Sequence, residues 1–201
     1  MATVLVFAPL LAAQVFAMGH VREVRAHGVT VRAVAHDHRN GSDAEIEIRR
    51  GGPSQVIELR GREIGAAMLL QSIEIVDANF DGHPDVLVMR EFGAKWSSSD
   101  VFLFDPRTQR FSATSPLAHA IGALANTTFD ARRRTITTHD IGPSDPSRVT
   151  YAVEGQSLRE TSSCRFVNPL DLRVGTLVRK TGERTRVTHV RLGASDVNPC
   201  D

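Results

Sequence analysis

The sequence consists largely of short segments in which apolar and polar residues alternate, separated by turn residues. The clearest segment covers residues 44–49, where Ile46 and Ile48 fall on one side and charged residues on the other. A Gly51-Gly52-Pro53 turn follows, and residues 55–60 alternate again. Because side chains of a strand point to opposite faces in turn, this pattern predicts two half-buried strands joined as a β-hairpin.

Other segments of similar length recur along the chain, whereas helical periodicity is nearly absent. Residues 63–70 could form two helical turns, and nothing else sustains a period of 3.6 residues. Further strands are expected at residues 30–34, 72–76, 85–89, 101–104, 135–138, 149–153, 174–179 and 185–190. Many short strands with turns between them predict an all-β fold, either an antiparallel β-sandwich or a barrel-like twisted sheet.

The N-terminus predicts export. Residues 4–16 form an apolar run that is too short to span a bilayer comfortably, and Val15-Phe16-Ala17 resembles a cleavage site with small residues. No Lys or Arg precedes the run, which departs from the usual signal peptide; a buried first strand or helix is the alternative. We expect a signal peptide at 1–17, one β domain at 18–201, and a periplasmic or secreted protein.

The two cysteines, Cys164 and Cys200, fit an oxidising compartment. A disulfide between them would tie the last residues to the fold and stabilise it by about 3–4 kcal/mol. Two unrelated thiols are the alternative. No Cys and His spacing is typical of zinc sites.

Composition and motifs exclude several functions. The chain has 24 basic and 23 acidic residues, so it lacks the electrostatic footprint of a nucleic-acid-binding protein. No nucleophile, metalloprotease or phosphate-loop motif occurs, which argues against an enzyme. Glu45 and Glu47 alternate with isoleucine as in an ordinary exposed strand. Residues 36–38 are interpreted as a solvated loop rather than a metal chelate, and residues 132–134 as exposed charge.

One segment, residues 77–85, has the chemistry of a calcium loop. Calcium prefers six to eight hard oxygen ligands, and alternate residues of a curled loop around a central glycine can supply them. Several carboxylates would also repel one another without a cation. The alternative is a turn capped by its own side chains. The expected ligands are Asp77, Asn79, Asp81, the backbone carbonyl of His83, and Asp85, with Gly82 at the bend.

The flanking residues show that this loop differs from an EF-hand. An EF-hand closes with glutamate at position 12, which here is Val88, and the flanking segments are typical of strands rather than helices. The loop therefore resembles the calcium loops that lie between strands in FG-GAP and integrin-type repeats.

Residues 72–111 resemble a family of small exported bacterial proteins. The resemblance lies in the string from Ile75 to Val86 and in the Val101-Phe102-Leu103-Phe104-Asp105-Pro106 segment that follows a polar loop. The family comprises periplasmic inhibitors of invertebrate-type lysozymes and related immunity proteins. These immunity proteins neutralise peptidoglycan-cutting effectors delivered by type IV secretion. The resemblance implies a lysozyme-like muramidase as the partner.

In that family, a loop with a Ser-Gly-x-x-Tyr-like motif enters the glycosidase cleft. The corresponding loop here is residues 91–99, next to the calcium loop in sequence. Gly93 takes the place of the glycine and gives the turn its φ freedom, Trp96 replaces the tyrosine, and Phe92 replaces the serine. Lys95 could pair with catalytic carboxylates of the target. The alternative is a partly buried Trp96 that covers the calcium loop.

The sequence thus leaves three functions to compare. The first is an exported inhibitor or immunity protein that blocks a lysozyme-like hydrolase with this loop. The second is a calcium-stabilised envelope module that binds glycan or protein without inhibiting an enzyme. The third, an enzyme, has the least support because no constellation of catalytic residues is visible. Neither nucleic acid nor a membrane span is expected.

Overall fold

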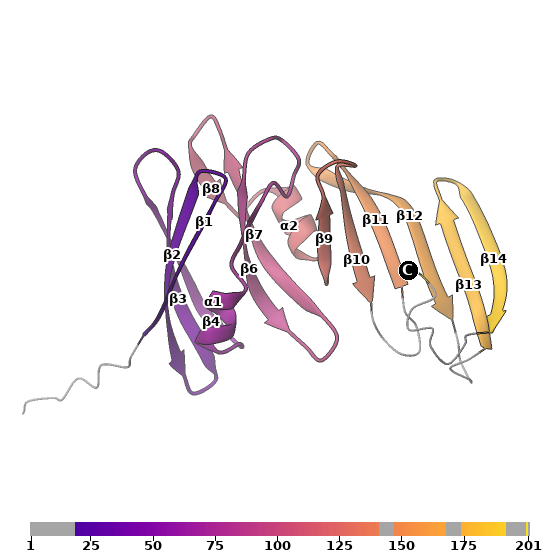
Figure 1. Cartoon of the computed structure of the whole chain (residues 1–201), viewed down its shortest axis with the longest axis horizontal. Coiled ribbons are helices and arrows are strands. Elements are labelled where there is room, and N and C mark those ends of the chain that lie inside the picture. Colours follow the sequence, from indigo (N-terminus) through magenta and orange to yellow (C-terminus); the bar gives the residue numbers. More distant parts are fainter. Residues whose placement is uncertain (1–18, 141–146, 168–173, 192–199, 201) are drawn as a thin grey trace, which may run out of the picture.

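A computed structural model describes residues 19–140, 147–167, 174–191 and 200. The expected signal peptide at 1–17 lies outside the described residues. The described part is mostly β and forms three antiparallel sheets that lie side by side, with two short helices (Figure 1).

The first sheet is a four-stranded meander in the order β1-β2-β3-β4. Its strands are β1 (His20–Ala26), β2 (Val29–His38), β3 (Gly41–Arg49) and β4 (Gln55–Arg62). The expected hairpin is confirmed: β3 and β4 are antiparallel, and Ile46 is the register partner of Ile57. The pattern of buried residues along β3 alternates as the sequence predicts.

The second and third sheets also follow the chain order. The second contains β5 (Glu74–Val76), β6 (Asp85–Phe92), β7 (Ser97–Asp105) and β8 (Arg110–Ser112). The third contains β9 (Thr127–Asp130), β10 (Thr135–Asp140), β11 (Ser147–Glu154), β12 (Ser157–Val167), β13 (Val174–Thr181) and β14 (Arg184–Arg191). No sheet in the described part closes on itself, so the barrel-like alternative is wrong.

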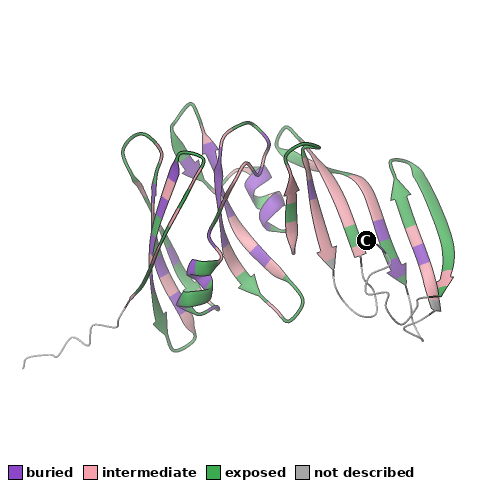
Figure 2. Ribbon diagram, in the orientation of Figure 1, coloured by how far each residue is buried: buried purple, intermediate pink, exposed green. Residues whose placement is uncertain are grey.

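The second sheet lies in the middle and is buried on both faces. One face packs against the first sheet through Val86, Val88 and Phe102. The other face packs through Leu87 and Val101 against the third sheet and α2 (Pro116–Gly122). Continuous apolar runs in β6 and β7 follow from this double burial, whereas β14 is exposed along most of its length (Figure 2).

The helices differ in how well the sequence predicts them. The helix expected at 63–70 is observed as α1 (Ala66–Gln71), with Leu69 and Leu70 buried. We did not expect α2. Its signal is the Ser115-Pro116 pair: the Ser115 hydroxyl accepts from the Ala118 N–H at 3.1 Å, and proline stands at the first helical position.

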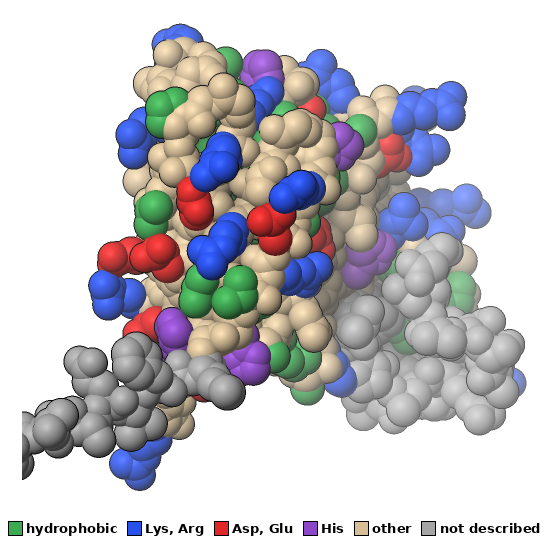
Figure 3. Space-filling view, turned by 60° about the vertical axis from the view of Figure 1, so that its left-hand side comes forward, with side chains coloured by type: hydrophobic (Ala, Val, Ile, Leu, Met, Phe, Trp, Pro, Cys, Tyr) green, Lys and Arg blue, Asp and Glu red, His purple; other side chains and the backbone are tan. Residues whose placement is uncertain are grey.

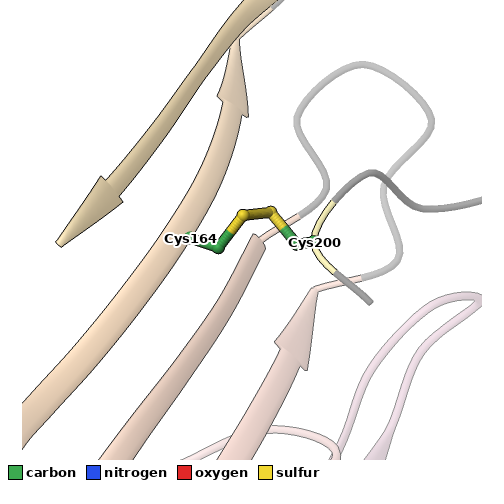
Figure 4. Close-up of a disulfide and its surroundings, with 2 residues drawn as sticks. All are labelled: Cys164 and Cys200. Atoms are coloured by element: carbon green, nitrogen blue, oxygen red, sulfur yellow. A yellow bond between two sulfur atoms is a disulfide. The ribbon is translucent and has the colours of Figure 1, made fainter. Parts of the chain in front are cut away.

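The disulfide between Cys164 and Cys200 is confirmed, with both residues buried (Figure 4). It joins β12 to the C-terminal cysteine and encloses a separation of 36 residues. A disulfide of this kind suggests an extracytoplasmic location. Within the described ranges, no helix has the length and apolar character to cross a membrane.

Candidate functional site

The two predicted sites lie at opposite ends of β6. The expected calcium loop leads into Asp85, the first residue of the strand, and the expected target-binding loop follows Phe92, the last. At about 3.3 Å per residue, these ends are roughly 23 Å apart. The alternative in which Trp96 covers the calcium loop is therefore wrong, because a whole strand separates the two segments.

The loop expected at residues 91–99 is mostly strand. β6 extends to Phe92 and β7 begins at Ser97, so the connection is a tight turn. The turn is closed by the Gly93 N–H, which donates to the Trp96 carbonyl at 2.7 Å. We call residues 92–96 the hairpin tip; it lies at the end of the two central strands of the middle sheet, where β6 turns into β7 (Figure 1).

The hairpin tip presents two exposed aromatic side chains. Phe92 is 55% exposed and Trp96 is 45% exposed, and Lys95 is also exposed. A Cβ atom on Gly93 would lie 2.3 Å from Trp96 Nε1, so the indole lies directly against this glycine. Gly93 does not have a positive φ, in contrast to our expectation. Glycine is required here because the indole occupies the space of a side chain.

Asn126 fixes the hairpin tip to the third sheet. Its side-chain carbonyl accepts from the Ser97 N–H at 2.9 Å, and its amide donates to the carbonyls of Lys95 and His139, both at 2.8 Å. The backbone of Asn126 has a φ of 48°, a left-handed conformation that asparagine tolerates better than most residues. No sequence pattern indicates that Asn126 contacts Ser97, 29 residues earlier.

A network of charged residues holds the strands behind the tip. Arg62 of β4 forms an ion pair with Asp100 of β7, and both side chains are largely buried. Arg90 donates to the Ser98 hydroxyl and to the Gly122 carbonyl, each at 3.2 Å. These contacts tie β6 and β7 to the first sheet and to α2. The tip therefore stands on a fixed base, although its aromatic side chains are open to solvent.

Substituting Gly93 with alanine should displace Trp96, because the new methyl group would overlap the indole. Trp96 is the single tryptophan of the chain, so tryptophan fluorescence reports its position directly. We expect a shift of the emission to longer wavelength as the ring moves toward water. Gly52→Ala is the matched control, since nothing closer than 4.0 Å would meet its Cβ. An unchanged spectrum for Gly93→Ala would contradict the packing described above.

At the other end of β6, the expected calcium ligands form a curled turn. The two carboxylate oxygens of Asp77 accept from the N–H groups of Asp81 and Gly82, at 3.0 and 2.9 Å. Asn79 accepts from the Asp81 N–H at 3.0 Å, and Asp81 accepts from the His83 N–H at 2.8 Å. Gly82 has a φ of 89°, which agrees with the expected bend.

Asp85 has a different role from the other acidic residues of the turn. Its side chain is fully buried; one oxygen accepts from the Ala78 N–H at 2.9 Å and the other from the Phe104 N–H at 2.8 Å. Burial raises the pKa of Asp85 to about 7, and repulsion from Asp81 and Asp77 adds to this shift. Through these two hydrogen bonds, the carboxyl group connects the turn to β7.

The fit of this turn to calcium is partial. Among the residues that the structure describes, no three His, Cys, Asp or Glu side chains are grouped to hold a metal ion. Asp77, Asn79 and Asp81 supply oxygen donors of the kind that calcium prefers. Asp85 does not fit with these donors because its side chain is fully buried between the turn and β7, whereas Asp77, Asn79 and Asp81 are at least partly exposed. The observed hydrogen bonds are those of the self-capped turn that was the alternative.

Long side chains from the other sheets hold this turn in place. Arg134 donates to the Phe80 carbonyl at 2.8 Å. Residues 132–134 were expected to be exposed charge only, but Arg134 also holds the backbone of the turn. Arg50, in the turn between β3 and β4, lies with its guanidinium group 3.1 Å from His83 Nδ1 and 4.0 Å from the centre of the Phe104 ring. The turn therefore sits where all three sheets meet.

The remaining candidates of the sequence are structural. Residues 36–38, expected as a loop, form the end of β2 because they pair with β3. Asp37 accepts from the Ala66 N–H at 2.7 Å, at the start of α1. Glu47 pairs with Arg49, and Glu45 is exposed on the outer face of the first sheet.

Comparison with known proteins gives a likeness of fold. No family model matches the chain, and no curated protein matches it. Among solved structures, the chain is similar to a Xanthomonas type IV secretion system related protein, with a TM-score of 0.53 and 17% sequence identity. The match covers 84% of this chain and 92% of the other. At this identity the likeness shows the fold alone.

Proposed function

We propose that this chain is an exported inhibitor or immunity protein that blocks a lysozyme-like peptidoglycan glycoside hydrolase. The observation that carries the proposal is the hairpin tip, which exposes Phe92 and Trp96 on a base fixed by Asn126 and Arg90. Aromatic side chains exposed in this way are typical of the anchors that dominate protein interfaces.

Inhibition would occur by occlusion of the cleft. Trp96 would occupy a sugar subsite, and Lys95 would approach the pair of carboxylates that glycosidases use for catalysis. Because the tip is already ordered by its contacts with the third sheet, less conformational entropy is lost when it binds. The same exposed residues would block either a host enzyme or an effector delivered by a competing cell.

Two further observations support this proposal. The disulfide suggests an extracytoplasmic location, where peptidoglycan is found, and agrees with a periplasmic or secreted protein. The fold is like that of a type IV secretion system related protein, which agrees with immunity to an effector delivered by such a system.

The test is to mix the purified, oxidised chain with a panel of muramidases and to measure peptidoglycan hydrolysis. We expect stoichiometric inhibition of at least one enzyme. Binding without inhibition would instead favour the envelope binding module, and hydrolysis by the chain alone would favour an enzyme. Either of these results would overturn the proposal, as would a lack of inhibition across the panel.

We further propose that Asp77, Asn79, Asp81 and the carbonyl of His83 bind calcium. Because only the folded state would bind the ion, calcium would raise the melting temperature of the protein, and a chelator would lower it. Asp81→Ala should abolish this difference, whereas Glu74→Ala, an exposed acidic residue of β5, should retain it. A melting temperature that is insensitive to chelator, with no calcium found by elemental analysis, would contradict the proposal.

A further inference from the structure

The outer face of the third sheet carries a row of hydroxyl groups. Five residues on neighbouring strands from β9 to β13 are register partners, and their side chains lie on one face. They are Thr128, Thr137, Thr150, Ser162 and Thr181. The hydroxyl oxygens of Thr137 and Thr150 are 3.3 Å apart. Ile136 is fully buried in the core on the other face, so the hydroxyl row faces away from the core.

The next row on this face contains three arginines. Across β10 to β14 it contains His139, Arg148, Cys164, Arg179 and Arg186. Arg148 and Arg186 are exposed, and neither forms an ion pair with a residue in the described ranges.

Three exposed arginines of the first sheet differ in this respect. Arg25, Arg49 and Arg60 each pair with a glutamate two residues earlier on the same strand. Basic and acidic side chains are accordingly interspersed over the forward face in Figure 3. Within the third sheet Arg159 likewise pairs with Glu154, so Arg148 and Arg186 stand out as arginines without an ion-pair partner among the described residues.

The hydroxyl row and the second row from β10 to β13 line a shallow groove, and Arg186 lies just beyond it, at the β14 end of the second row. Two adjoining hollows of about 440 and 200 Å³ share Arg148, Thr150 and Ser162 in their lining. The ion pair between Asp130 and Arg133 lies at one end, and the disulfide lies at the other. The groove therefore crosses the strands from β9 to β13, which at about 4.8 Å per strand is roughly 19 Å.

The distribution of charge along the sequence agrees with a site for a polyanion. Residues 127–191 contain twelve basic and seven acidic residues, whereas the rest of the chain contains twelve basic and sixteen acidic residues. The net charge of the whole chain is therefore nearly neutral, although the segment that contains the third sheet is basic. Electrostatic attraction of an anionic ligand would be directed to this part of the molecule.

We propose that this groove binds an anionic polysaccharide whose carboxylate groups repeat along the chain. Serine and threonine hydroxyls donate and accept hydrogen bonds, as sugar hydroxyls do, and the guanidinium groups of Arg148 and Arg186 would bind the carboxylates. The site is separate from the hairpin tip, so the proposal does not depend on inhibition of a hydrolase.

Other polyanions fit the groove less well. Phe129 is the one Phe, Tyr or Trp in the described lining, and its register partner is buried Ile136, so the floor lacks the series of large aromatic rings on which successive bases stack. An extended acidic peptide would bind best along a strand edge, where backbone groups are free, whereas this groove crosses the strands.

The experiment measures binding of polygalacturonate to the full, oxidised chain, with dextran as the neutral polymer. We expect binding to polygalacturonate alone, weakened by salt and at least tenfold weaker in Arg148→Gln/Arg186→Gln. The matched control, Arg25→Gln/Arg60→Gln, removes the same charge from the first sheet and should bind as the wild type does. Equal loss in both variants would overturn the proposal.

A second variant tests the hydroxyl row. Thr137→Val/Thr150→Val preserves shape and should weaken binding about threefold to tenfold per lost hydrogen bond, while Thr30→Val on the first sheet should not. Absence of binding, or tighter binding to polyglutamate or to anionic lipid vesicles, would overturn the proposal. Melting temperatures near that of the wild type ensure that the variants are folded.

Discussion

Replacing Asp85 with alanine is expected to lower the free energy of unfolding by about 4 kcal/mol. The substitution leaves the N–H groups of Ala78 and Phe104 buried without an acceptor, and each such group costs about 1–3 kcal/mol. It also separates the turn at residues 77–84 from β7. Chemical denaturation of both proteins, followed by circular dichroism, measures the difference.

The same residue should make stability depend on pH when calcium is removed by a chelator. The pKa of Asp85 is raised from 3.8 to about 7 in the folded protein, so between these values the folded state binds more protons than the unfolded state. Stability from this group is therefore complete below pH 4 and is lost as pH rises through 7. The loss is at most about 4 kcal/mol.

Asp85→Asn isolates this effect because asparagine does not titrate. The difference in unfolding free energy between wild type and Asp85→Asn should grow in favour of wild type as pH falls from 8 to 5. A difference that is constant across this range would show that Asp85 has an ordinary pKa. Glu74→Gln, on the exposed side of β5, serves as a control for a carboxylate in water.

Replacing Trp96 with alanine should weaken inhibition of the target hydrolase by about 2 kcal/mol or more, which is about a thirtyfold increase in the inhibition constant. The indole is the largest side chain of the hairpin tip, is 45% exposed, and packs against Gly93 before binding. Lys95→Ala should cost less, unless the ammonium group meets a desolvated carboxylate of the target.

The controls for Trp96→Ala separate binding from folding. Val56→Ala removes a similarly exposed apolar side chain from the first sheet and should inhibit as the wild type does. The melting temperature of Trp96→Ala should remain near that of the wild type because the residue is half exposed. If the folded variant inhibits normally, the hairpin tip is not the binding surface.

The parts of the fold that depend on local pattern could be predicted from the sequence. The β3–β4 hairpin follows from clean alternation around a glycine-proline turn, and the disulfide follows from the presence of two cysteines in a chain whose N-terminus predicts export. β12 was missed because hydroxyl and charged residues dominate Ser157–Val167, and such a strand lacks the apolar alternation of a half-buried one. The number of sheets depends on which faces pack together, which no local pattern encodes.

The candidate site shows the same limit. The pairing of Gly93 with Trp96 was predictable as a motif, although its reason is steric contact rather than φ freedom. Asn126 and the ion pair of Arg62 with Asp100 were not predictable, since they join residues 29 to 38 positions apart. The contacts that orient the hairpin tip arise only when the three sheets assemble.

Because the middle sheet has no solvent-facing side, the molecule cannot be divided into independent pieces. Removal of the first sheet would expose Val88 and Phe102 to water, and removal of the third would expose Leu87 and Val101. Trimming the protein to a minimal inhibitor built around the hairpin tip should therefore give an aggregating fragment. The tip could instead be transplanted onto another scaffold, provided that the recipient supplies a substitute for Asn126.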